Sequence, residues 1–124
     1  MSPASQSNAP RPILLLVEDD GSVRRSLQFL LLDKGFDIRA FASAVAALAS
    51  AVAETADVLV ADYRLADGDG ISMLRELRRR GWPGKAVLIT GMGSPQIARE
   101  ALDAGFLAVL NKPVRPHELL ALIR

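Results

Sequence analysis

The chain has 124 residues, half of them hydrophobic, and a formal net charge of +1, which excludes general disorder and gives no electrostatic argument for nucleic acid or a membrane surface. Cysteine is absent, so disulfides and thiolate chemistry are excluded, and no apolar run approaches the roughly 18 residues of a membrane span. We expect a cytoplasmic protein in which residues 1–12 form a disordered tail and residues 13–124 form one domain.

The first half of this domain alternates between apolar runs and amphipathic segments. The continuous branched run at 13–17 predicts a strand buried on both faces, and apolar residues at helical spacing predict a helix over 21–34 that ends at Gly35. The alternating segment 36–41 is typical of a strand near a sheet edge. A second helix is predicted around 45–52, with Ser43 as its N-cap.

The second half repeats the same alternation three times. Strands are predicted over 58–61, 85–89 and 106–110. Helices are predicted around 71–77, from the Ser94-Pro95 start signal to Gly105, and from Pro116 to the end of the chain. Five strands alternating with five helices predict right-handed βαβ units, and therefore an α/β fold whose parallel sheet is covered on both faces.

Polar side chains follow four of the five predicted strands, at the sheet edge where open α/β folds bind ligands. They are Glu18, Asp19 and Asp20 after the first strand, Asp62 after the third, Thr90 after the fourth and Lys112 after the fifth. Neighbouring carboxylates raise one another's pKa unless a hard divalent cation such as Mg²⁺, or a lysine, lies beside them. One carboxylate could then act as a nucleophile toward a phosphoryl group, with Lys112 and the cation taking up charge and Thr90 hydrogen-bonding a phosphoryl oxygen.

Four segments in order, VEDD, DYRLADGDG, ITG and NKPV, resemble the receiver domain of two-component response regulators over about residues 13–124. The resemblance implies a flavodoxin-like (βα)5 three-layer sandwich with a parallel sheet in the order 2-1-3-4-5. It implies that Asp62 is the phosphoacceptor and that Thr90 and Lys112 contact the phosphoryl group. The implied Mg²⁺ ligands, which would also accept Mn²⁺, are Glu18 through water, Asp19, Asp62 and the backbone carbonyl of Arg64.

The resemblance also implies a function and partners. A histidine kinase or a histidine phosphotransfer protein would supply the phosphoryl group, and the domain would catalyse only its own phosphotransfer and autodephosphorylation, so it is not an enzyme with a separate substrate. The surface of the fourth helix, fifth strand and fifth helix would carry the signal and could pair two copies in a homodimer. The KPV ending resembles receivers at the C-terminus of hybrid histidine kinases. Lys112-Pro113 resembles a peptide bond of the receiver family that is often cis.

Two positions depart from the family pattern. Ala66 stands where the family often has proline, so we expect a looser loop after Asp62. Val109 stands where the family usually has Tyr or Phe, and an aliphatic side chain cannot supply the usual ring rotation. A receiver-like interaction module that signals without phosphorylation is therefore the main alternative. A phosphatase of the haloacid dehalogenase type is a weaker alternative, suggested by the segment DGDGIS. The catalytic loop of that family should directly follow a strand, whereas Asp67 lies five residues beyond a strand end.

Each candidate site residue also has a purely structural explanation. Asp62 could cap a helix or a turn, and the acids after the first strand could stabilise the first helix, a role that we expect for Asp20. Thr90 could be an ordinary strand-end residue and Lys112 a solvated lysine. All four motifs occurring together at strand ends favour the site interpretation for Glu18, Asp19, Asp62, Thr90 and Lys112.

Three other polar features are expected to lie outside the chemistry. Asp67 and Asp69 are predicted to be turn residues, because Asp-Gly pairs favour tight turns. The basic run at 75–80 is predicted to be a solvated helix end, where basic residues suit the helix dipole, and no nucleic-acid partner is expected. His117 is predicted to be a surface residue.

Overall fold

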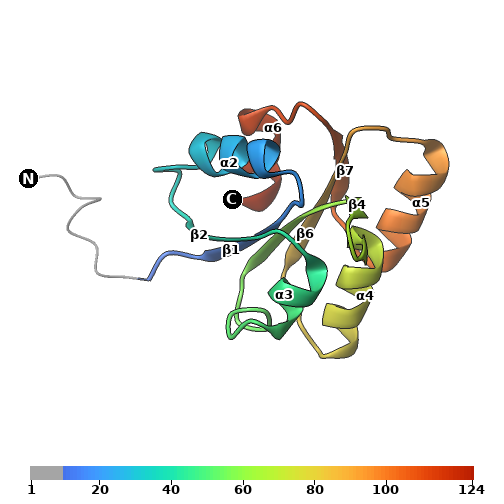
Figure 1. Ribbon diagram of the computed structural model, residues 1–124, viewed down its shortest axis with the longest axis horizontal. Helices are drawn as coiled ribbons and strands as arrows, with labels where there is room; N and C mark the ends of the chain where they lie inside the picture. Colours follow the sequence, from blue (N-terminus) through green and yellow to red (C-terminus); the bar gives the residue numbers. More distant parts are fainter. Residues whose placement is uncertain (1–9) are drawn as a thin grey trace, which may run out of the picture.

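The computed structural model describes residues 10–124 (Figure 1). Residues 1–9, which make up most of the predicted tail, lie outside the described part, and residues 10–12 are exposed without regular secondary structure. No helix within 10–124 has the length and apolar character that crossing a membrane requires.

Five parallel strands form the central sheet in the order β2-β1-β3-β6-β7. They are β1 (Ile13–Val17), β2 (Asp37–Phe41), β3 (Val58–Asp62), β6 (Lys85–Thr90) and β7 (Ala108–Asn111). Counted as core strands, this order is 2-1-3-4-5, so the predicted flavodoxin-like topology is confirmed. The central strand β3 is buried along its whole length, as its continuous apolar run indicated.

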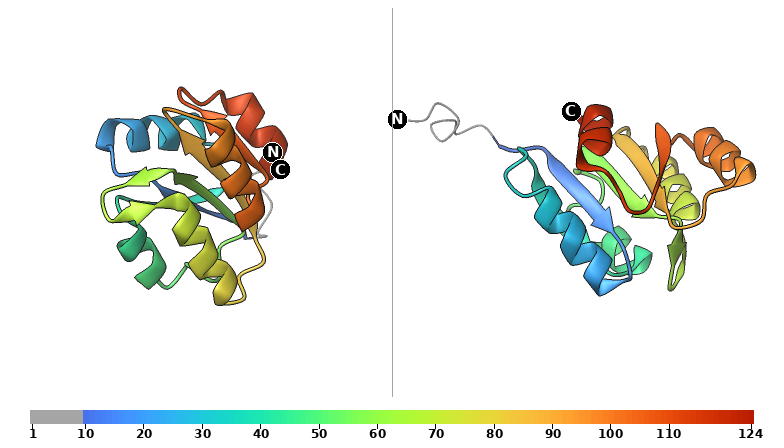
Figure 2. Two further views of the ribbon diagram at one scale, coloured as in Figure 1. Left: turned by 90° about the vertical axis from the view of Figure 1, so that its right-hand side faces the viewer. Right: turned by 90° about the horizontal axis from the view of Figure 1, so that it is seen from above.

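Five helices cover the two faces of this sheet. They are α2 (Gly21–Leu30), α3 (Ala44–Ala49), α4 (Gly70–Arg79), α5 (Pro95–Ala104) and α6 (Pro116–Ile123). Figure 1 shows α2 and α6 over one face and α3 and α4 on the other, and the views in Figure 2 agree. Alternate strand residues serve the two cores: Leu14 and Leu16 face α2 and α6, while Leu15 and Val17 face α3 to α5.

Several helix boundaries agree with the predicted caps. Ser43 accepts from the Ala46 amide, Ser94 accepts from the Ile97 amide, and Asp20 accepts from two amides of α2. The α2 helix ends earlier than predicted, at Leu30, and Asp33 (φ 60°) has a left-handed backbone that a right-handed helix cannot continue.

Two other predicted elements are also shorter in the structure. The α3 helix ends at Ala49 because the backbone of Ser50 is extended. Strand β7 begins at Ala108, not at residue 106, because the Phe106 amide donates to the Ala101 carbonyl at the end of α5.

A short antiparallel hairpin that was not predicted follows β3. Its strands are β4 (Arg64–Leu65) and β5 (Gly68–Asp69), with Ala66 and Asp67 as the two residues between them. The Asp69 side chain then caps α4 by accepting from the Ser72 amide at 2.7 Å. The hairpin therefore connects the end of β3 directly to the start of α4.

The basic end of α4 makes specific contacts. The Arg78 guanidinium lies 5.1 Å from the centroid of the Trp82 ring, donates to the Trp82 carbonyl at 2.8 Å and reaches the Gly105 carbonyl at 3.4 Å. Arg79 and Arg80 both pair with Glu76. The prediction of a solvated helix end is therefore wrong for Arg78, which links the end of α4 to the end of α5.

Candidate functional site

The polar side chains at the strand ends meet in one cluster. Asp62 is the last residue of β3, Glu18 follows β1, and Lys112 follows β7. The Lys112 ammonium lies 2.9 Å from Asp62 Oδ2 and 2.6 Å from Glu18 Oε1. Because parallel strands end at the same edge of the sheet, residues far apart in the chain meet here, as predicted.

Glu18 is the most deeply buried member of this cluster, with 0% of its surface exposed. Its Oε2 accepts from the Asp20 amide at 3.1 Å, whereas its Oε1 has no aligned hydrogen-bond donor among residues 10–124 and forms an ion pair with Lys112 at 2.6 Å. Burial raises the pKa of Glu18, although the bond to Lys112 opposes the shift. Partial burial lowers the pKa of Lys112, but the bonds to Glu18 and Asp62 outweigh it and leave that pKa raised.

The acidic residues fit a hard divalent cation. Carboxylate oxygens of Glu18, Asp19 and Asp62 lie within 4.8 Å of one another, with Asp19 exposed and the other two buried. Oxygen ligands of this kind suit Mg²⁺, which typically binds one or two carboxylates and keeps several waters. The buried Glu18 Oε1 without an aligned donor is the kind of polar atom that a bound cation or its water would satisfy.

A pocket of about 320 Å³ opens beside the acids. It is lined by Asp62, Arg64, Thr90, Gly91, Met92 and Lys112. Thr90 is 3% exposed, and its hydroxyl oxygen accepts from the Met92 amide at 3.2 Å. The Lys112 amide donates to the Thr90 carbonyl at 2.8 Å, which joins the ends of β6 and β7. The structure therefore brings Thr90 and Lys112 to the same pocket as Asp62, while the role of the Arg64 carbonyl stays a prediction.

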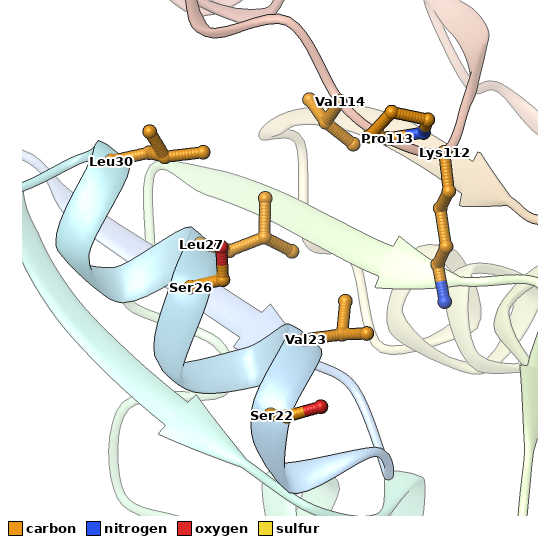
Figure 3. A pocket seen from close by; sticks show the side chains of 8 residues that line it. All are labelled: Ser22, Val23, Ser26, Leu27, Leu30, Lys112, Pro113 and Val114. Atoms are coloured by element: carbon orange, nitrogen blue, oxygen red, sulfur yellow. The ribbon is translucent and has the colours of Figure 1, made fainter.

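A second pocket, of about 440 Å³, lies against α2 on the other side of Lys112 (Figure 3). Its lining from α2 consists of Ser22, Val23, Ser26, Leu27 and Leu30, and its opposite wall consists of Lys112, Pro113 and Val114. Figure 3 shows Val23 and Leu27 pointing from α2 toward that wall. The Lys112-Pro113 peptide bond is cis, as the resemblance implied.

Sequence reasoning missed the contacts of three residues around the site. Arg24 donates to the Glu18 carbonyl at 2.8 Å from the second turn of α2. Gly70 leaves the space that α4 needs beside β3, because a Cβ there would lie 2.5 Å from the Asp62 carbonyl oxygen. Asp67 bonds to the start of α3 instead of serving only its own turn. The two glycines flanking Asp69 were visible in the sequence, but nothing local signalled the contacts of Arg24 and Asp67.

Comparison with known proteins agrees with this geometry. The family model of the response regulator receiver domain matches residues 14–124. Transcriptional regulatory protein FixJ of Azorhizobium caulinodans is 33% identical over 109 residues, which cover 88% of this chain and 52% of FixJ. Nodulation protein W of Bradyrhizobium diazoefficiens is 36% identical over 110 residues, 89% of this chain and 48% of that protein. The chain therefore spans about half the length of the curated relatives that it matches.

Solved structures of receiver domains are also similar to this chain. A CheY-like response regulator receiver domain protein from Methanospirillum hungatei superposes with a TM-score of 0.81 at 28% identity, over 90% of this chain and 89% of that one. Chemotaxis protein CheY4 of Vibrio cholerae superposes with a TM-score of 0.81 at 26% identity, over 90% and 94%. With its buried acids, its lysine and this match over nearly the whole chain, the protein belongs to the response regulator receiver domain family.

Proposed function

We propose that this chain is a phosphorylation-dependent switch of a two-component or phosphorelay system, in which Asp62 accepts a phosphoryl group. The observation that carries the proposal is the Lys112 ammonium between the buried carboxylates of Glu18 and Asp62, beside an open pocket. Burying charged groups costs free energy, and such groups are concentrated at functional sites, so this cluster favours a reaction or a ligand there.

In the proposed reaction a carboxylate oxygen of Asp62 forms a bond to the donor's phosphorus atom, and the bond between that phosphorus and the donor breaks with its electron pair leaving on the donor. Lys112 holds an ammonium against Asp62, so it can pair with an oxygen of the transferred group. The Thr90 hydroxyl oxygen accepts from the Met92 amide, which leaves its proton free to donate to the same group.

Glu18, Asp19, Asp62 and the carbonyl of Arg64 are the residues that would hold Mg²⁺. The ion would supply positive charge to the oxygens of the transferring phosphoryl group. The described cluster contains three carboxylates and the single ammonium of Lys112, so a bound cation would reduce the repulsion among the carboxylates.

A histidine kinase or a histidine phosphotransfer protein is the proposed donor. The groove between α2 and the segment 112–114 adjoins Lys112, and its apolar face of Val23, Leu27 and Leu30 could seat a partner next to the pocket. The transcriptional regulatory protein FixJ and nodulation protein W are both about twice as long as this chain, so we propose that the domain controls an output that lies outside residues 1–124. Neither of these two relatives supports the expected place at the end of a hybrid kinase.

The signal would leave through α5, β7 and α6. Leu102 and Leu107 are exposed large apolar residues on this part of the molecule, which suits a surface for a partner or a second copy. Val109 lies in β7 and packs, partly buried, against the core beneath α5. With an aliphatic side chain there, movement of the segment after Thr90 would have to carry the change without a rotating ring.

Incubation with acetyl phosphate and Mg²⁺, followed by intact mass measurement, tests the proposal. Wild type should gain the mass of one phosphoryl group, and Asp62→Asn should gain none. Beryllofluoride with Mg²⁺ should give a bound ¹⁹F resonance in wild type only. Equal uptake by wild type and Asp62→Asn would refute the assignment of Asp62. No uptake by a folded wild type, together with unchanged partner binding, would favour the interaction module that signals without phosphorylation.

A further inference from the structure

Asp67 makes an unexpected connection between two distant segments. It lies at the tip of the β4–β5 hairpin, yet its Oδ1 accepts from the Ala44 amide at 3.1 Å and its Oδ2 from the Val45 amide at 2.8 Å. Both amides belong to the first turn of α3, more than twenty residues earlier in the chain. These hydrogen bonds lower the pKa of Asp67, and the bond from Val45 has the largest effect. The side chain is therefore a carboxylate that bridges the two segments at neutral pH.

The start of α3 already has a cap of its own. Ser43 accepts from the Ala46 amide at 3.1 Å, so it satisfies one of the free amides of the first turn. Asp67 satisfies two more of these amides, those of Ala44 and Val45. A helix of six residues gains stability from both caps, but only the bonds of Asp67 also restrain another segment.

That other segment is the one that follows the proposed phosphoacceptor. Leu65 pairs with Gly68, which makes Ala66 and Asp67 the central residues of a two-residue turn. Neither residue has a positive φ. In turns of this kind proline is favoured at the first central position, which is Ala66 here. Ala66 lacks the ring that would stiffen this position, and the bonds of Asp67 to α3 supply an external restraint in its place.

We propose that Asp67 is a positioning residue for the metal site, because it fixes the hairpin that carries Arg64, the residue whose backbone carbonyl is a proposed Mg²⁺ ligand. This proposal rests on the proposed function for its Mg²⁺ site. Asp69 anchors the other end of the hairpin to α4 through the Ser72 amide and hydroxyl. Asp67 therefore secures the free end, and its loss should loosen the hairpin without removing any ligand.

The test compares Asp67→Ala with Ser43→Ala, which weakens the start of the same helix but leaves the hairpin restrained. Amide hydrogen exchange of the metal-free proteins should be faster at Leu65 and Gly68 in Asp67→Ala and unchanged there in Ser43→Ala. Calorimetric titration with Mg²⁺ should show binding about 10-fold weaker in Asp67→Ala, as when a residue behind a metal ligand is lost, and close to wild type in Ser43→Ala. Asp67→Asn, which keeps one acceptor oxygen, should fall between them.

A rescue variant separates positioning from helix stability. Adding Ala66→Pro to Asp67→Ala should recover most of the Mg²⁺ affinity, because the ring stiffens the turn, yet it cannot restore the lost caps of α3. Equal Mg²⁺ affinity in wild type and Asp67→Ala, or an equal loss in Ser43→Ala, would overturn the positioning role while leaving the proposed function intact. A folded wild type that binds no Mg²⁺ would overturn both.

Discussion

Lys112 donates a hydrogen bond of 2.9 Å to Asp62, a residue fifty positions earlier in the chain, and the same ammonium lies 2.6 Å from Glu18. Replacing Lys112 with methionine keeps the aliphatic stem but leaves two buried carboxylates without their cation. We expect the free energy of unfolding in metal-free buffer to fall by about 2 kcal/mol. Urea denaturation followed by circular dichroism measures the change.

Mg²⁺ should restore part of this loss, since a bound cation replaces the missing charge. The matched control is Lys34→Met, which removes an exposed lysine away from the acids and should leave the unfolding curve unchanged. A Lys112→Met protein as stable as wild type in metal-free buffer would contradict the importance of the ion pair.

Replacing Glu18 with glutamine should make the metal-free protein more stable at neutral pH. Burial raises the pKa of Glu18 above its ordinary value of 4.5, so the folded state binds this proton more tightly than the unfolded state does. By linkage, ionisation of Glu18 lowers the stability of the wild type as the pH rises above 4.5. The advantage of Glu18→Gln should therefore be present at neutral pH and disappear below pH 4.5, as denaturation in the presence of a chelator can measure.

The same variant should gain less stability from Mg²⁺ than the wild type does, because one acidic group of the site is gone. If saturating Mg²⁺ stabilised wild type and Glu18→Gln to the same degree, the ion would lie away from this carboxylate. Acids away from the cluster titrate in the same way in both proteins, so their contributions cancel in the comparison.

The opposite pH dependence is expected for Glu76. Bonds from Arg79 and then Arg80 lower the pKa of Glu76 from 4.5 to about 2. Its contribution to stability is complete above pH 4.5 and is lost as the pH falls toward 2. Glu76→Gln should therefore be less stable than wild type at neutral pH, with a difference that shrinks on acidification and in high salt.

Thermal denaturation over this pH range measures the Glu76 effect. Glu54→Gln is the control, because its contact with Arg80 is longer, at 3.4 Å, and it should change stability less. A pH-independent difference between wild type and Glu76→Gln would show that packing, not charge, explains its contribution.

Gly70→Ala should damage both stability and phosphoryl uptake. The added Cβ would lie 2.5 Å from the Asp62 carbonyl oxygen and 2.8 Å from Leu88 Cδ1, so α4 or the end of β3 has to move. Overpacking of this kind costs about 2 kcal/mol. Gly91→Ala, whose Cβ would have no atom within 4 Å, should fold with wild-type stability. Unfolding curves and the acetyl phosphate assay together test this, and normal values for Gly70→Ala would contradict the close contact.

The sheet and the centre of the site could be predicted because their signals are local. A run such as 58–61 indicates a buried strand by itself, and a polar residue at its end, such as Asp62, is then placed at a sheet edge by topology alone. Parallel pairing does the rest, since the ends of β1, β3 and β7 all reach that edge. The agreement for Glu18, Asp62 and Lys112 follows from this geometry.

The parts that could not be predicted depend on contacts between distant segments. The bonds of Asp67 to α3 span more than twenty residues and need α3 to be placed first. The bond of Arg24 to the Glu18 carbonyl spans only six residues, but it depends on how the chain turns from β1 into α2, and neither contact leaves a periodic pattern in the sequence. The Asp-Gly pair is a strong local signal that predicts a turn at Asp67, and Asp67 does lie in the turn. Its second role arises from α3, which packs nearby only in the folded protein.

The contact between Arg78 and the Gly105 carbonyl gives α5 two unequal ends. Arg78, which stacks on Trp82, fastens the C-terminal end of this helix to α4, while residues 91–94 before the helix and its first two residues are all exposed. A small displacement that starts at Thr90 would move the N-terminal end of α5 first, and the helix would tilt about its C-terminal end at Gly105. The displacement of α5 would then be largest near Pro95, so a partner that binds there would respond most strongly.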